Sequence, residues 1–187
     1  SVSTGTYNTL IGGLAGDAIT TGVRNSTMGY GSGGQLTTGS YNVALGMATL
    51  AATTTQSNNT AVGYEALNQN RAADNTAVGY FALNVNTTGT LNVALGTGAL
   101  DANTTANANT AIGYAALGAN TTGTENTSLG YNSGAAVTTG IYNTLAGSRS
   151  GDAITTGTRN AAFGYSALTA DTVGSRAVAI GYEALAT

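Results

Sequence analysis

Apolar and polar residues recur along this chain with a period of 17 residues. Aligned on the phrase Asn-Thr-Ala-Val-Gly-Tyr, the sequence holds eleven copies, and each interval between copies is 17 residues except for one of 16. Counted from the first residue of the phrase, position 4 is apolar and position 5 is Gly in every copy. A fixed period of this length is typical of stacked repeats, in which each unit packs against its two neighbours. The copies begin at Asn8, Asn25, Asn42, Asn59, Asn75, Asn92, Asn109, Asn126, Asn143, Asn160 and Ala177.

Glycine at a second position divides the unit in two. Position 15 is Gly in seven copies, among them Gly22, Gly89 and Gly157. Because Gly accepts positive φ and close backbone approach, two Gly per unit predict two bends. A unit with two bends leaves room for two short strands, whereas a helical hairpin needs roughly twice that length. We therefore expect an all-β fold, a parallel β-solenoid of about eleven coils that rise ~4.8 Å each, with a length of ~50 Å.

One large apolar side chain alternates between positions 9 and 12 of the unit. Seven copies have Leu at position 9, and the complete coils among them have a polar residue at position 12. The other four have Gly at position 9 and an apolar residue at position 12, as in Gly151 and Ile154. We interpret this as one interior slot per coil, because an empty slot and a doubly filled slot would both destabilise a close-packed core. The side chains expected to point inward are Leu67, Leu83, Ile19 and Ile154, and those expected not to are Asn70, Asn86 and Asn120.

Small residues at position 3 bear on the oligomeric state. This position lies on the strand face opposite to position 4. Two large apolar side chains per coil are a thin core against a backbone ordering cost of roughly 1–2 kcal/mol per residue. We therefore expect the strand face that carries these small residues to form the contact between chains in a homotrimer. The alternative is that this face is exposed to solvent. The Ala residues are Ala44, Ala61, Ala77, Ala94, Ala111, Ala162 and Ala179.

The composition agrees with stacked strands and argues against several functions. The 187 residues include no Pro, which cannot donate to a strand ladder, and only 7% are charged. Stacking would bring like charges together, whereas Asn and Thr can form hydrogen-bonded ladders. A net charge of −3 without clustering argues against nucleic-acid binding. No apolar run approaches the ~20 residues that span a bilayer.

Catalytic and metal-binding residue types are scarce. The chain has no His and no Cys, so the usual general bases and nucleophiles are missing. Asp17, Asp101 and Asp152 share position 10 but belong to distant coils, which disfavours a paired-carboxylate site. We expect no enzymatic activity, no cofactor and no metal site. One ion at an Asn- and Asp-rich turn stays open as an alternative.

Tyrosine at position 6 is the candidate binding feature. Stacked coils would place these rings in a partial ladder. The ladder could be an aromatic stripe that contacts carbohydrate, or it could pack at a bend with its hydroxyl groups in water. We favour packing, because the Tyr belongs to the repeat itself. The seven residues are Tyr30, Tyr64, Tyr80, Tyr114, Tyr131, Tyr165 and Tyr182.

The repeat runs through residues 1–187 without a break, which predicts a single continuous domain. Both Ser1 and Thr187 lie at position 11 of a coil. Segment 4–25 is closely matched by segment 139–160, which indicates a second, longer repeat. Because open solenoid ends expose strand edges, we expect this array to be a piece of a longer fibre, or to continue into another chain.

The repeated phrase resembles a known family. Segments 59–63, 75–79, 109–113 and 177–181 (NTAVG, NTAVG, NTAIG and AVAIG) resemble the head repeats of YadA-like trimeric autotransporter adhesins. The longer form, NTAVGYxAL followed by NTTG, is similar to repeats of bacteriophage tail fibres and bacterial surface proteins. The resemblance implies a left-handed parallel β-roll with three chains per rod. The unit here is longer than in most adhesin heads, and Thr usually replaces Ser after Asn.

From the resemblance and the composition together, we expect an extracellular fibre segment on a phage tail or a bacterial cell surface. It would be a homotrimer that mediates or presents attachment to a cell-surface glycan or protein receptor, without nucleic acid and without membrane insertion. The alternative is a passive extracellular filament or spacer whose binding parts lie elsewhere. Surface residues that break the repeat would favour attachment, and a uniform surface would favour the spacer.

Overall fold

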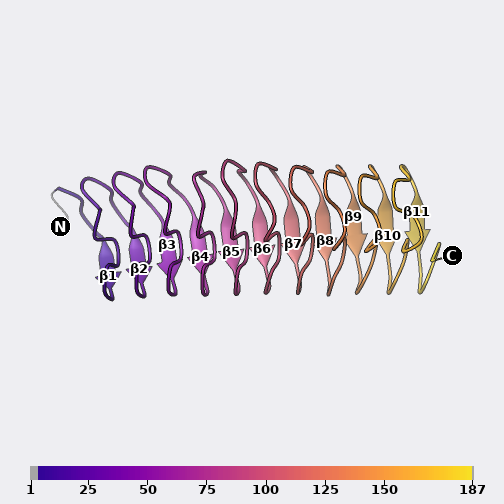
Figure 1. The fold of residues 1–187 in the computed structure, drawn as a ribbon, viewed down its shortest axis with the longest axis horizontal. Helices are drawn as coiled ribbons and strands as arrows, with labels where there is room; N and C mark the ends of the chain where they lie inside the picture. The colour runs from indigo at the N-terminus through magenta and orange to yellow at the C-terminus, as the bar shows by residue number, and fades with distance from the viewer. Residues whose placement is uncertain (1–3, 187) are drawn as a thin grey trace.

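The chain forms a straight rod of stacked coils (Figure 1). The structure, a computed structural model, describes residues 4–186, so Ser1 and Thr187 lie outside the described residues. Within this range, eleven three-residue strands form one parallel sheet, and each strand pairs with the next in sequence. The predicted parallel β-solenoid is confirmed. The strands are β1 (Thr9–Ile11), β2 (Ser26–Met28), β3 (Val43–Leu45), β4 (Thr60–Val62), β5 (Thr76–Val78), β6 (Val93–Leu95), β7 (Thr110–Ile112), β8 (Thr127–Leu129), β9 (Thr144–Ala146), β10 (Ala161–Phe163) and β11 (Val178–Ile180).

Every strand covers positions 2–4 of its unit, and equal positions pair across neighbouring strands. β4 and β5 keep this register, with Thr60 beside Thr76, although their coil is one residue short. The missing residue falls on the return path of the coil. There Asn59 Nδ2 donates to the carbonyl oxygen of Ala72 at 3.0 Å, which takes the place of the position-15 carbonyl used by other coils. A turn absorbs the deletion, and the sheet stays intact.

The expectation of two strands per coil is wrong, because the backbone bends at more than two places. The backbone has a positive φ at positions 5, 7 and 9, which follow one another closely. Only positions 2–4 therefore stay extended. The return path is held to its neighbours at position 13 instead, where Thr87 N donates to Thr104 O at 2.8 Å. In the coil that begins at Asn75, the left-handed residues are Gly79 (φ 137°), Phe81 (55°), Leu83 (50°) and Leu91 (61°).

Close approach between coils explains both repeated glycines. A Cβ on Gly79 at position 5 would lie 2.6 Å from the carbonyl carbon and oxygen of Gly96 in the next coil. At position 15, a Cβ on Gly89 would meet Asn86 Oδ1 at 2.5 Å and the carbonyl oxygen of Ala106. Only the first of these two glycines is left-handed. The bend expected at position 15 is therefore a tight contact between coils rather than a left-handed turn.

The predicted burial of the large apolar residue, at position 9 or at position 12, is confirmed. Leu67 and Leu83 at position 9, and Ile19 and Ile154 at position 12, are at most 1% exposed. Position 9 is left-handed in both kinds of coil, with φ of 50° at Leu83 and 60° at Gly151. Gly adopts this conformation without strain but leaves the slot empty, so position 12 fills it.

Position 3 takes part in the same exchange, which the sequence interpretation missed. A Cβ on Gly151 would lie 2.7 Å from Leu145 Cδ2, so the Leu145 side chain occupies space that Leu at position 9 fills elsewhere. All seven coils with Leu at position 9 have Ala at position 3. In the coils of Gly16 and Gly151, Leu at position 3 and Ile at position 12 therefore fill the interior together. The coils with Gly at position 9 have Leu10, Thr27, Ser128 and Leu145 at position 3.

Position 3 faces the coil interior, so both readings of its Ala residues are wrong. Ala61 and Ala94 are fully buried within their own chain, and they neither pack chains together nor meet solvent. The space between the strand and the position-9 Leu admits only a small side chain. Position 4, which was counted toward the core, points outward instead, and Leu95 and Phe163 are 44% and 41% exposed.

The polar residues at position 12 also lie inside, contrary to expectation. Asn70, Asn86 and Asn120 are fully buried. The Asn86 side-chain amide donates to Asn70 Oδ1 at 2.7 Å and to the Gly89 carbonyl oxygen at 2.8 Å. Buried polar groups are tolerated when they are hydrogen-bonded, and the equal position in the next coil supplies the partner.

A second Asn ladder at position 1 fixes the start of each strand. The backbone amide of Asn92 donates to Asn75 Oδ1 at 3.0 Å, and Asn92 Nδ2 donates to Ala106 O at 2.8 Å. Threonine forms a third ladder at position 13, where Thr87 Oγ1 donates to Thr104 O at 2.9 Å. The predicted Asn and Thr ladders are confirmed, and they satisfy polar groups without placing like charges side by side.

Candidate functional site

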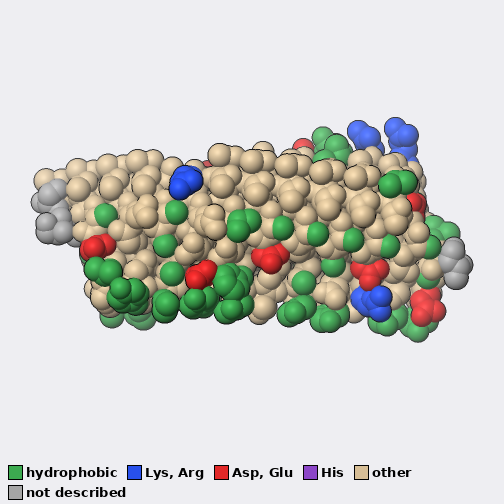
Figure 2. All heavy atoms as spheres, in the orientation of Figure 1, with side chains coloured by type: hydrophobic (Ala, Val, Ile, Leu, Met, Phe, Trp, Pro, Cys, Tyr) green, Lys and Arg blue, Asp and Glu red, His purple; other side chains and the backbone are tan. Residues whose placement is uncertain are grey.

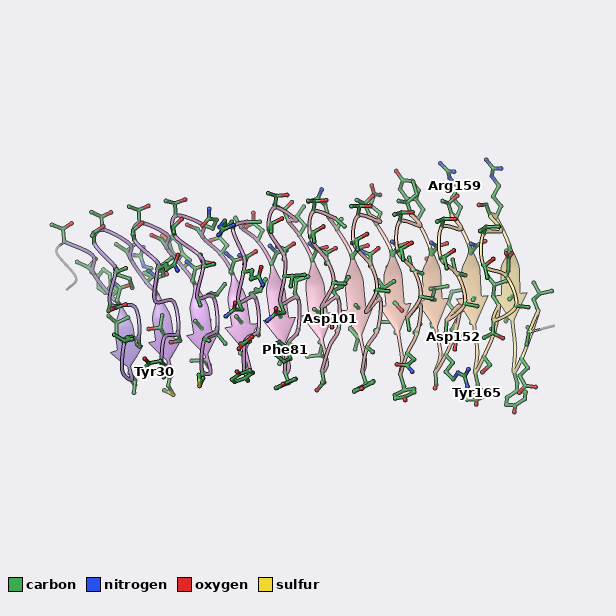
Figure 3. The ribbon with its side chains drawn as sticks, viewed as in Figure 1. Tyr30, Phe81, Asp101, Asp152, Arg159 and Tyr165 are labelled. Carbon is green, nitrogen blue, oxygen red and sulfur yellow. The ribbon has the colours of Figure 1, made fainter. Side chains whose placement is uncertain are left out.

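The outer face of the sheet carries exposed apolar side chains along the rod. Figure 2 shows hydrophobic side chains, tyrosine included, gathered along the lower edge of the molecule, where Figure 3 labels Tyr30 and Tyr165. Exposed apolar side chains that lie close together mark interaction sites more often than singly scattered ones do. We call the exposed position-4 side chains the outer stripe. They are Ile11, Met28, Leu95, Ile112, Leu129, Phe163 and Ile180.

The seven Tyr at position 6 form an exposed edge beside this stripe. The bend at position 5 turns their rings out of the sheet, and their exposed fraction runs from 38% at Tyr64 to 73% at Tyr182. Hydrogen bonds from Tyr64 to Glu65, and from Tyr182 to Glu183, raise the pKa of each phenol above its ordinary value. The stacked pairs are Tyr64–Tyr80, Tyr114–Tyr131 and Tyr165–Tyr182, with ring centroids 5.3–5.4 Å apart.

The tyrosine edge is interrupted at regular intervals. Met47, Thr97 and Ser148 replace the ring in every third coil, and Gly13 replaces it near the N-terminus. Asp at position 10 occurs only in the coils whose position 6 is small, as in Thr97 with Asp101. In three coils, therefore, a carboxylate at position 10 occurs together with the absence of a Tyr ring at position 6. The pairs are Gly13–Asp17, Thr97–Asp101 and Ser148–Asp152.

The gap at Thr97 is an open hollow of ≈ 220 Å³. Tyr80 and Tyr114 lie in the coils on either side of Thr97, and Gly98 and Asp101 complete its floor and edge. Desolvation in the hollow raises the pKa of the Asp101 carboxyl, although the backbone amides of Ala102 and Asp101 act in the opposite direction. Phe81 and Ala115 also line the hollow, which is mostly apolar apart from the carboxylate and a threonine hydroxyl.

The coil of Ser148 also has Asp at position 10, and there an arginine of the same chain pairs with it. Arg149 stands at the position of Gly98, and its Nε donates to Asp152 Oδ2 at 2.9 Å. Asp152, and to a smaller extent Tyr165, raise the pKa of the Arg149 guanidinium. Figure 3 places Asp152 and Tyr165 on the same side of the rod as Asp101 and Phe81.

Arginine also stacks on tyrosine along the opposite edge of the rod, at position 17. The guanidinium carbon of Arg24 lies 5.4 Å from the ring centroids of both Tyr7 and Tyr41. The guanidinium of Arg159 lies 5.3 Å from the ring of Tyr142. Figure 3 shows Arg159 at the upper edge, away from the tyrosines of position 6.

The acidic residues are spread along the described part of the rod. No group of three acidic side chains within residues 4–186 is placed to hold a metal ion. Asp101 and Asp152 are separated by three coils. In the same part of the chain, no helix is long and apolar enough to cross a membrane.

The sequence identified the tyrosines but not the gaps between them. The structure brings six of the seven predicted Tyr together as stacked pairs, and Tyr30 lies between Gly13 and Met47 at position 6. The sequence analysis did not predict the hollow at Thr97, because residues from three successive coils line it. The coincidence of a small residue at position 6 with Asp at position 10 was the available signal.

Comparison with known proteins adds no relative. No family model, no curated protein and no solved structure matches this chain.

Proposed function

We propose that this chain is a segment of an extracellular homotrimeric fibre that mediates or presents attachment to a cell surface, without enzymatic activity. The phrase shared with adhesin heads and phage tail fibres points to a phage tail or a bacterial surface as its location. The receptor would be a glycan or a protein. Stacked repeats provide extended surfaces, which suit reach and display more than catalysis.

Trimer formation is supported by the outer stripe rather than by the Ala residues. Leu95, Ile112 and Leu129 present apolar side chains on three successive strands, β6, β7 and β8. Leaving such groups in water costs about 25 cal/mol for each Å² of apolar surface that a partner could cover. Two further copies of the same rod would offer a surface of the same length and spacing.

The interrupted tyrosine edge is the observation that favours an attachment role over a passive spacer. A spacer needs only the repeat, and its surface could be uniform. Here small residues and carboxylates replace rings at intervals of three coils, at Thr97 with Asp101 and at Ser148 with Asp152. Exposed aromatic rings beside a mostly apolar hollow that holds one charged group are common in recognition surfaces.

The attachment role can be tested by measuring how the purified, fluorescently labelled rod binds to bacterial cells. We expect saturable binding that falls when Tyr80 and Tyr114 are both replaced by Ser. A matched control replaces Tyr7 and Tyr41, on the opposite edge, by Ser, and it should bind as the unchanged rod does. Absence of rod binding to all of these cells would favour the passive spacer.

A further inference from the structure

The hollow at Thr97 has the dimensions of one missing planar group. Adjacent tyrosines on this edge stack 5.4 Å apart, and Tyr80 and Tyr114 are separated by two coils, with Thr97 between them. A flat group at the level of Thr97 would therefore lie one stacking distance from each ring. The Thr97 side chain does not reach across this space, and the hollow stays open.

The opposite edge of the rod shows which group this molecule places between two such rings. Tyr7 and Tyr41 are also two coils apart, and the guanidinium of Arg24 lies at 5.4 Å from both centroids. A guanidinium is planar and cationic, so it is attracted to the faces of two aromatic rings at once. Arg24 Nη1 also donates to the Tyr41 hydroxyl at 2.8 Å.

The gap at Ser148 shows which group accompanies the carboxylate at position 10. There the guanidinium of Arg149 donates to Asp152 at 2.9 Å and lies near Tyr165. Arg149 has φ of 58°, and Gly98, its counterpart at Thr97, has φ of 65°. The backbone therefore has the same conformation at this position in both coils. The coil of Ser148 supplies an arginine there, and the coil of Thr97 does not.

We propose that the hollow at Thr97 binds a guanidinium group, contributed by an arginine side chain of a partner protein. Asp101 accepts its hydrogen bonds, as Asp152 does from Arg149, and Tyr80 and Tyr114 cover its two faces. Gly98 leaves the entry open, since a Cβ there would come no closer than 4.0 Å to any other residue. The biological meaning of this site rests on the proposed attachment role, but guanidinium binding is measurable whether or not the rod attaches to cells.

The experiment titrates methylguanidinium and N-acetyl-arginine methylamide into the isotope-labelled chain and follows the Gly98 amide and tyrosine ring resonances by NMR. Both probes should shift these resonances, with dissociation constants on the order of 10 mM for a partly exposed site. Methylammonium should bind several-fold more weakly, because it is not planar and cannot donate two parallel hydrogen bonds to a carboxylate. Preferential binding of methyl glucopyranoside would assign the hollow to sugars and overturn the proposal.

Two variants and one matched control locate the site. Asp101→Asn should weaken binding of both probes about fivefold through loss of the charge-assisted bonds. Gly98→Arg copies Arg149 and should abolish binding by filling the hollow with its own guanidinium. Gly31→Arg introduces the same side chain at position 7 of another coil, beside Tyr30 and without an Asp at position 10, and should leave binding unchanged. Unchanged affinity in both Asp101→Asn and Gly98→Arg would contradict the assignment.

The source of the arginine is tested separately, by the mass of the chain in solution. If a separate partner supplies it, Asp101→Asn should leave the oligomeric mass unchanged. A lower mass would mean that a second copy of this chain supplies the guanidinium, and the separate partner would then be ruled out.

Discussion

At the scale of single residues, the left-handed backbone at position 9 decides how the interior of each coil is filled. Leu at this position accepts a strained conformation, which costs roughly 1–2 kcal/mol, and fills the slot. Gly avoids the strain, and positions 3 and 12 then supply the volume, as Leu145 and Ile154 do in the coil of Gly151. The two solutions bury similar apolar groups at the same place.

Replacing one way of filling the coil interior by the other tests this explanation directly. Leu117→Gly should destabilise the rod by about 2–5 kcal/mol, because it leaves a cavity. The triple change Ala111→Leu, Leu117→Gly and Asn120→Ile should recover most of the loss. It also removes Asn120 Oδ1, a buried oxygen without a hydrogen-bond partner in the described structure. The measurement is the free energy of unfolding in urea, and a triple variant as unstable as Leu117→Gly would refute the exchange.

The buried leucine ladder should respond far more strongly to truncation than exposed leucine does. Leu83 is fully buried, and Leu91, in the same coil, is 61% exposed. Leu83→Ala should lower the free energy of unfolding by about 2–5 kcal/mol. Leu91→Ala makes the same chemical change at the surface and should stay within about 0.5 kcal/mol. Equal losses in the two variants would mean that the interior is not where the structure places it.

The Asp101 carboxyl should titrate above the ordinary aspartate pKa of 3.8, because desolvation in the hollow disfavours its charged form. A raised native pKa means that the folded chain binds a proton more tightly than the unfolded chain does. This group therefore contributes stability at low pH that is lost as pH rises through the raised native pKa. Carbon-detected NMR titration gives the midpoint, and a value at or below 3.8 would contradict the geometry of the hollow.

At the scale of elements, one three-residue strand per coil holds the rod together through its two neighbours. Left-handed residues on both sides keep each strand short, and the Asn ladder at position 1 aligns its start, as with Asn75 and Asn92. Position 5 is one of two positions where an added Cβ would collide with the backbone of the next coil. Gly is required there for two reasons. Its φ is positive, and a side chain would collide with the carbonyl group of the next coil, as at Gly79 and Gly96.

A pair of Gly→Ala changes separates these two requirements. Gly79→Ala adds a Cβ 2.6 Å from the backbone of the next coil and should cost about 3 kcal/mol or more. Gly31→Ala also places Ala at positive φ, but nothing lies within 4 Å of its Cβ, so it should cost about 1 kcal/mol. Thermal unfolding followed by circular dichroism measures both. Similar losses would show that φ alone, and not contact between coils, keeps Gly at position 5.

The period and the exchange between positions 9 and 12 were enough to predict the parallel solenoid, its register and the burial of Leu83 and Ile154. The inward and outward faces were not predictable in the same way. A three-residue strand has one inward residue, and nothing in its apolar pattern says whether Ala at position 3 or the larger side chain at position 4 takes that place. The buried Asn86 was missed because a polar residue reads as exposed until its partner in the next coil is known. The hollow depends on Tyr80, Asp101 and Tyr114, which only the stacking of three coils brings together.

At the scale of the whole molecule, the rod carries large apolar side chains on its outer face as well as in its interior. The side chains of Ile112 and Leu129 are 37% and 39% exposed on the outer face, whereas Leu117 is fully buried in the interior. This arrangement is consistent with a unit whose outer face is completed by other copies. The proposed homotrimer, and with it the fibre, depends on that completion.

The most direct measurement of this claim is the mass of the purified chain by multi-angle light scattering at micromolar concentration. A trimer of 18.3 kDa chains predicts about 55 kDa, three times the chain mass. The double variant Ile112→Asp and Leu129→Asp should lower the mass to that of one chain while the β signal in circular dichroism persists, because both side chains point away from the interior. A single species at the mass of one chain for the unchanged protein would contradict the homotrimeric fibre.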